Sequence, residues 1–140
     1  MKVKYNEAAI YCRVAYADET TMETQKDTVM RFAEAQGYTV TESYLDNGKS
    51  GVTLDRPGMN RLLADIRGGN IKRVITKDIA RIARNIFLFE SFLEEARSHG
   101  VIILTVHDGV FEPTLKDRLN ILQRNESGIA AHSDVGANGG

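Results

Sequence analysis

The residues best suited to chemistry in this sequence are arginines at the ends of predicted strands. Arg13 ends the first predicted strand, Arg56 closes the loop after the second, and Arg81 and Arg84 follow the third. A guanidinium stays charged at every useful pH, and its planar fork matches the paired oxygens of a phosphate. Arginines are also commonly solvated or paired with carboxylates. The residue types and spacing alone therefore predict an anion site, with a phosphodiester as the expected ligand.

Alternating apolar and turn-forming segments predict the elements that position these arginines. Apolar or β-rich runs predict strands over 8–14, 38–45, 73–76 and 101–106. Helical spacing predicts helices over 21–36, 57–67 and 79–98, and a short one over 113–124. Thr20 or Thr21 is the expected N-cap of the first helix, and Gly37 its stop. Strands that alternate with helices indicate an α/β domain with a mostly parallel sheet, whose functional groups gather at the carboxyl ends of the strands.

Composition is typical of one soluble globular domain. The 140 residues include 42% hydrophobic and 26% charged side chains, and the net charge of −1 lacks the basic excess of a dedicated DNA-binding domain. A single cysteine, Cys12, predicts a reduced protein of the cytoplasm. No apolar stretch is long enough for a membrane span. The domain is expected over 1–125, and residues 126–140 are expected to form a disordered tail.

Other kinds of site find little support. His99, His107 and His132 have no metal-ligand spacing, so neither a metal nor a cofactor is expected. Ser50 lies between two glycines, but the lysine and hydroxyl residue of a phosphate-binding P-loop are absent in the required order. A phosphoryl-receiver domain has a similar rhythm of elements, but it needs an aspartate where Arg13 ends the first strand.

Several separated motifs, in the expected order and spacing, carry a resemblance to a known family. They are Tyr11–Val14 followed by Ala15, Gln25, Asp46–Gly51, Asp55–Gly58, Lys77–Asn85 and His107–Val110. This pattern resembles the catalytic domain of the serine recombinases, the resolvases, invertases and transposon integrases, and is most similar to the large members found in mobile elements. The resemblance covers about residues 7–110. It implies a resolvase-like, three-layer fold with a central sheet of four to five strands flanked by helices, and an antiparallel strand near one edge.

The resemblance also assigns roles to individual residues. Arg13, Arg81 and Arg84 match the arginines that bind the scissile phosphate. The matching supporting residues are Arg56, Ser50 and Gln25. Ala15 stands where the family has the nucleophilic serine, and Ala80 stands where aspartate or serine is usual. A methyl group cannot form the phosphoserine link, so cleavage is expected to be lost.

Two functions from different classes follow from this pattern. The first is a site-specific recombinase domain that cleaves and rejoins DNA through serine, made inactive by Ala15. The resemblance implies DNA as the partner, held through a C-terminal region absent from this chain, and assembly into a homodimer or tetramer. The alternative, which Ala15 and Ala80 together favour, is a non-catalytic regulatory or remnant interaction module.

Overall fold

A five-stranded mixed sheet forms the centre of the protein. The computed structural model describes the backbone of residues 4–133 and the side chains of residues 4–124. The strands are β1 (Glu7–Val14), β2 (Thr39–Asn47), β3 (Arg73–Thr76), β4 (Ile102–Thr105) and β5 (Val110–Phe111), in the order β2-β1-β3-β4-β5. The first four run parallel, whereas β5 pairs antiparallel to β4 at the edge of the sheet. The predicted fold class and the antiparallel edge strand are therefore confirmed.

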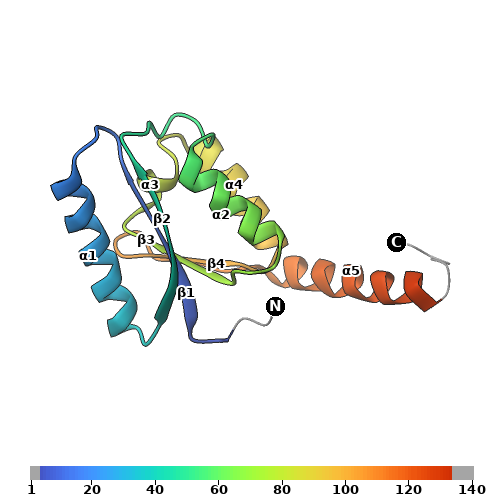
Figure 1. Ribbon diagram of the computed structural model, residues 1–140. Helices are drawn as coiled ribbons and strands as arrows, with labels where there is room; N and C mark the ends of the chain where they lie inside the picture. The colour runs from blue at the N-terminus through green and yellow to red at the C-terminus, as the bar shows by residue number, and fades with distance from the viewer. Residues whose placement is uncertain (1–3, 134–140) are drawn as a thin grey trace.

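The helices cover both faces of the sheet, which gives three layers. Helix α1 (Glu19–Ala35) lies on one face, and α2 (Pro57–Arg67) and α4 (Ile86–Ser98) lie on the other (Figure 1). Successive side chains of β1 point to opposite faces, so Ile10 packs toward α1 whereas Tyr11 packs toward α2 and α4. Both side chains are fully buried. The strand β1 therefore lies between two strands and two helical layers.

The first helix begins two residues earlier than the sequence pattern predicts. Asp18 is the N-cap, and its Oδ1 accepts hydrogen bonds from the amides of Thr20 and Thr21. A carboxylate at this position also interacts favourably with the helix dipole, which explains why neither threonine caps the helix. Gly37 has a φ of +85° and its amide donates to Glu34 O, so the predicted stop is confirmed.

The single long helix predicted over 79–98 is wrong. The structure has a four-residue helix, α3 (Ile79–Ile82), an extended residue at Ala83 and then α4. Asn85 caps α4 by accepting hydrogen bonds from the amides of Phe87 and Leu88. The carbonyls at the end of α3, which would accept from the next turn of a continuous helix, accept from two buried arginine side chains instead.

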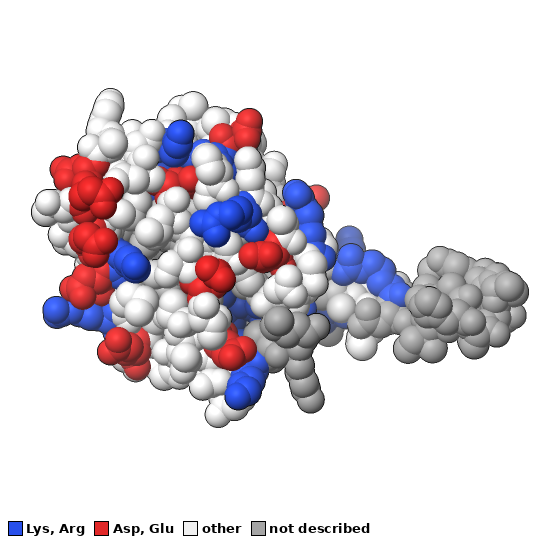
Figure 2. Space-filling view, in the orientation of Figure 1, with Lys and Arg blue, Asp and Glu red and all other residues white. Residues whose placement is uncertain are grey.

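The last helix, α5 (Leu115–Ser133), extends away from the sheet (Figure 1). Its backbone continues past residue 125, where the sequence pattern places the end of the ordered domain, and residues 134–140 lie outside the described part of the chain. The division of the chain at residue 125 stays a prediction. On the face shown in Figure 2, acidic side chains gather over α1 and basic ones lie along the start of α5. This separation of charge agrees with the near-zero net charge of the whole chain.

Candidate active site

Arg13 lies at the carboxyl end of β1 and is almost completely buried, with 1% of its surface exposed. Its guanidinium donates to three backbone carbonyls: Nε to Arg81 O at 2.8 Å, Nη1 to Lys49 O at 2.9 Å and Nη2 to Ala80 O at 2.7 Å. Burial lowers the pKa of this guanidinium, and the nearby Arg56 lowers it further. Arg13 therefore joins the loop after β2 to the helix after β3.

Arg56 is the second buried arginine, with 2% of its surface exposed. Its Nη2 donates to Ile82 O at 2.5 Å and its Nη1 to Ser50 O at 3.2 Å. The guanidinium carbon lies 5.7 Å from the centre of the Tyr11 ring, within the range of a cation–π contact. Nε, 3.9 Å from Asp46 Oδ2, has no hydrogen-bond partner among the described residues. Arg56 thus bonds the same two segments as Arg13, the loop after β2 and the helix α3.

Arg81 and Arg84 are the more accessible arginines of the four. The Arg81 side chain is 29% exposed, and its Nε lies 3.5 Å from Asp78 Oδ1. Arg84 is exposed and lies outside α3, so it does not share one continuous helix with Arg81 as the predicted helix over 79–98 would require. The Arg84 amide donates to Gly51 O at 3.0 Å, which fixes the segment between α3 and α4 against the loop after β2.

Gly51 shows how closely the strand-end segments approach one another. A Cβ added to Gly51 would overlap the Cγ of Arg84, and it would lie 2.7 Å from Nη2 and 2.9 Å from Cζ of Arg13. Only a residue without a side chain fits between these two arginines. The structure therefore brings Arg13 and Arg84 together at Gly51, and Arg13 also bonds the backbone carbonyl of Arg81. The side chains of Arg81 and Arg84 line two different hollows.

Ala15 is the first residue after β1 and is half-buried. The carbonyl of the preceding residue, Val14, accepts from the amides of Gly48 at 2.7 Å and Lys49 at 3.1 Å. Lys49 in turn accepts from Arg13 through its own carbonyl. Residue 15 is thus held where the end of β1 meets the loop after β2, one residue beyond the strand that carries Arg13.

The remaining predicted residues occupy the same edge of the sheet. Gln25, on α1, is buried and bonds both backbone polar groups of Arg13. Ser50 is exposed, and its hydroxyl accepts from the amide of Val52 at 3.2 Å. Ala80 offers its carbonyl to Arg13, and its methyl group lines a hollow of about 280 Å³ beside Arg84 and α4.

Sequence reasoning missed the roles of Tyr11 and Asp46. The Tyr11 hydroxyl donates to Asp46 Oδ2 at 2.7 Å, and the same carboxylate accepts from the amides of Gly58 and Met59, at the start of α2. Burial is the main reason why the pKa of Tyr11 is raised. Asp46 lies in β2, far in sequence from the start of α2 at Pro57, so no local capping pattern marks it.

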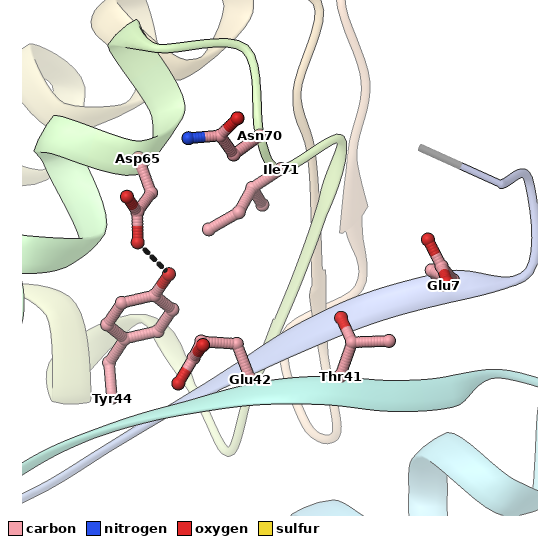
Figure 3. Close-up of a pocket in the computed structure, with 7 residues that line it drawn as sticks. All are labelled: Glu7, Thr41, Glu42, Tyr44, Asp65, Asn70 and Ile71. Atoms are coloured by element: carbon pink, nitrogen blue, oxygen red, sulfur yellow. Dashed lines mark hydrogen bonds between the residues drawn. The ribbon is translucent and has the colours of Figure 1, made fainter. Parts of the chain in front are cut away.

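A second cavity, away from Arg13, Arg56, Arg81 and Arg84, is lined by several acidic side chains. It has a volume of about 330 Å³ and lies between the middle of β2 and the end of α2 (Figure 3). Glu7, Glu42 and Asp65 line it, and the Tyr44 hydroxyl donates to Asp65 Oδ2 at 2.5 Å. Its carboxylates would repel a phosphate, so anion chemistry belongs to the arginine edge of the sheet.

The described residues offer neither a metal cluster nor a membrane-spanning helix. Among them, no three His, Cys, Asp or Glu side chains gather in a way that could hold a metal ion. The side chain of His132 lies outside the described part. No helix of the described chain is both long and apolar enough to cross a membrane.

The chain is a doubly covered α/β sheet with arginines at the carboxyl ends of its strands, the edge at which such folds place their functional groups. Residues 8–132 match the family model described as "Resolvase, N terminal domain". The chain therefore belongs to the resolvase family, as its motifs suggested, and is a serine recombinase catalytic domain. No match is found among the curated proteins.

Solved structures share the fold of this chain. The N-terminal catalytic domain of TP901-1 integrase superposes with a TM-score of 0.72 at 22% identity, covering 91% of this chain and 97% of that one. The C-terminal catalytic domain of ISC1926 TnpA, an IS607-like serine recombinase, gives 0.67 at 27% identity, covering 90% and 84%. A resolvase family site-specific recombinase from Streptococcus pneumoniae gives 0.65 at 25% identity, covering 91% and 89%.

Proposed function

We propose that this chain is the strand-cleavage domain of a site-specific DNA recombinase in which Ala15 occupies the position of the nucleophilic serine. The observation that carries the proposal is that Arg13 bonds the backbone carbonyl of Arg81 and packs with Arg84 against Gly51, in the loop next to residue 15. Cationic side chains from different segments, packed at a strand-end edge, suit a phosphodiester and the extra negative charge of its transition state.

The chemistry needs a hydroxyl at residue 15. With serine there, the hydroxyl oxygen would form a bond to phosphorus, and the bond from phosphorus to one sugar oxygen would break. The proton of the serine hydroxyl would pass to water, the released sugar oxygen would take up a proton from water, and the protein would hold the DNA end as a phosphoserine. Reversal of these steps would rejoin a strand. Alanine has no oxygen to form the first bond, so this chain binds the phosphodiester without cleaving it.

The proposed partners are DNA and further copies of a recombinase chain. With a net charge of −1, this domain has little overall electrostatic attraction for the DNA backbone by itself. We therefore propose that this domain acts on one phosphate of the DNA. Other parts of the assembly supply most of the affinity for DNA.

One observation favours a second function, that of a non-catalytic regulatory module. Ala80 also lacks the polar side chain that the family's pattern has at that position, so two polar groups are missing from one edge. A module of this kind would join an assembly of active subunits and bind DNA there without cutting it.

Plasmid cleavage separates the two functions. The chain, unaltered and as Ala15→Ser, is fused to the DNA-binding region of a serine recombinase whose site is known. The recombinase proposal predicts that only the Ala15→Ser protein nicks or linearises a plasmid carrying that site. If neither protein cuts while both fold and bind the site, the regulatory function is favoured. The double variant Ala15→Ser with Ala80→Asp then shows whether Ala80 is the reason for the missing cleavage.

A further inference from the structure

The connection between β1 and α1 is only three residues long. It runs from Ala15 to Ala17, between Val14 at the end of β1 and Asp18, the N-cap of α1. Because this connection carries residue 15, whatever fixes its path also fixes where the side chain at that position lies. Contacts with the end of β2 and the loop after it hold the connection on both sides.

Asn47, the last residue of β2, bonds the α1 side of this connection through both ends of its side-chain amide. Its Oδ1 accepts from the backbone amide of Asp18 at 3.0 Å, and its Nδ2 donates to Glu19 Oε1 at 2.8 Å. The first bond fixes the backbone at the N-cap, and the second fixes the first side chain of α1. This pattern uses one acceptor and one donor, whereas an ionised aspartate would offer acceptors only.

Gly48 holds the β1 side of the connection and packs closely against it. Its amide donates to Val14 O at 2.7 Å, and its φ of +80° is a conformation that residues with side chains rarely adopt. A Cβ added to Gly48 would lie 3.0 Å from the Cβ of Ala17. The connection is therefore bonded before residue 15 and after residue 17, with little room to move toward β2.

The side chains of the connection itself do little to hold it. Tyr16 is 87% exposed, and Ala15 and Ala17 end at a methyl group. A segment with few buried contacts of its own moves easily unless its neighbours fix it. Among the described residues, Asn47 is the one whose side chain supplies two such bonds.

We propose that Asn47 is a positioning residue for the reaction at residue 15. It clamps residues 15–17 by joining the start of α1 to the end of β2, so that a serine at residue 15 would meet the phosphate from one fixed place. The inference rests on the proposed function, because that function makes residue 15 the position of the nucleophile. A reacting group displaced by about 1 Å loses much of its rate.

Backbone nitrogen-15 NMR relaxation of the whole 140-residue chain tests the clamp without DNA. Asn47→Asp removes the donor and places a carboxylate against Glu19. The amides of residues 15–17 should then become mobile, with order parameters that fall from about 0.85 toward about 0.6. Asn60→Asp is the matched control, because Asn60 likewise donates to a carboxylate, Asp55 Oδ1 at 3.0 Å, and it should leave residues 15–17 unchanged. Unchanged order parameters in Asn47→Asp would overturn the clamp.

Two further variants separate the clamp from the added charge. Asn47→Ala loses both bonds without adding a charge, and it should loosen residues 15–17 as well. In the double variant Asn47→Asp with Glu19→Gln, the new amide can donate to the new carboxylate, and the net charge equals that of the unaltered chain. The original order parameters should return. If Asn47→Ala leaves residues 15–17 rigid, the loosening in Asn47→Asp comes from repulsion alone and the proposal is wrong.

Cleavage links the clamp to the reaction. In the fused Ala15→Ser protein, Asn47→Asp should lower the nicking rate at saturating protein at least about tenfold, without changing the protein concentration that gives half of this rate. Adding Glu19→Gln should recover the rate. A residue that only stabilised the fold would leave the rate unchanged well below the unfolding temperature, and that result would overturn the positioning role.

The outcomes for the two proposals are distinguishable. If the fused Ala15→Ser protein never nicks DNA, the proposed function is contradicted, and the relaxation data of the free chain still decide whether Asn47 clamps residues 15–17. If nicking occurs and Asn47→Asp does not slow it, the proposed function stands and the positioning role is overturned.

Discussion

Gln25 bonds both backbone polar groups of Arg13. Its Oε1 accepts from the Arg13 amide at 2.9 Å, and its Nε2 donates to the Arg13 carbonyl at 3.0 Å. On this side of β1 the pairing with β3 ends at Tyr11 and Thr76, so Arg13 has no neighbouring strand there. The glutamine side chain replaces the missing strand and fastens α1 to the end of β1, just before residue 15.

Gln25→Ala should destabilise the domain markedly. Two buried backbone groups would lose their partners, and each costs about 1–3 kcal/mol when left unsatisfied. We expect urea unfolding to show a loss of about 2–4 kcal/mol. Gln36→Ala, a like change at an exposed position at the end of α1, should lie within about 0.5 kcal/mol of the unaltered chain. Equal effects of the two variants would contradict the role given to Gln25.

Gly51→Ala should disturb the side chains of Arg13 and Arg84 more than it disturbs the sheet. The new methyl group would overlap Arg84 and press on Arg13, and overpacking of this kind costs about 1–3 kcal/mol. Thermal unfolding measures the cost, and the NMR signals of the arginine Nε–H groups show where it falls. Gly68→Ala is the control, because Gly68 has an ordinary helical φ of −77° and ends α2 away from the site. A Gly51→Ala protein with unmoved arginine signals would show that the loop does not cover Arg13.

Asp46→Asn should be one of the most damaging single substitutions. The carboxylate accepts from Tyr11 and from two amides of α2, and it faces the buried Arg56. Neutralising one partner of a buried pair costs about 3–5 kcal/mol. Asp27→Asn, which removes the exposed partner of Arg31, should cost less than about 1 kcal/mol. Chemical denaturation of both variants checks the difference, and a mild Asp46→Asn phenotype would mean that the carboxylate is not needed to hold α2.

The stability of the fold should fall at alkaline pH because of Cys12. Burial raises the pKa of this thiol to about 12 in the folded protein, whereas an unfolded thiol ionises near a pKa of about 8.5. The folded state therefore keeps a proton that the unfolded state loses. Above about pH 8.5, the free energy of unfolding should fall by about 1.4 kcal/mol per pH unit from this group.

Cys12→Ala isolates that contribution. Urea titrations at about pH 8 and about pH 10 should give a steeper loss for the unaltered chain than for the variant, even though the variant is less stable at both values. The same pH dependence in both proteins would assign the alkaline loss to other groups.

The strands could be predicted from the sequence because runs of apolar residues indicate buried segments directly. The runs ending in Arg13 and Thr76 are strands in the structure, and the expectation that their ends meet at one edge is met by Arg13 and Arg81. The helical spacing of the residues did not predict the break between α3 and α4. Local helix propensity continues through that segment, and the groups that interrupt it, Arg13 and Arg56, are distant in sequence.

The burial of two arginines was the least predictable feature of the site. Arginine is rarely buried unless its donors are paired, and the partners here are backbone carbonyls, which a sequence does not mark. The sequence pattern predicted an anion site without separating the four arginines, whereas the structure divides them into buried Arg13 and Arg56 and accessible Arg81 and Arg84.

Covalent trapping at residue 15 tests the central claim most directly. The fused protein, unaltered or as Ala15→Ser, is incubated with its DNA site, denatured and digested, and mass spectrometry locates any nucleotide attached to a peptide. Our account predicts a phosphoserine at residue 15 in the Ala15→Ser protein and no adduct in the unaltered protein. An adduct on another residue, such as the exposed Tyr16, or in the unaltered protein, would contradict it, because residue 15 would not be the position of the nucleophile.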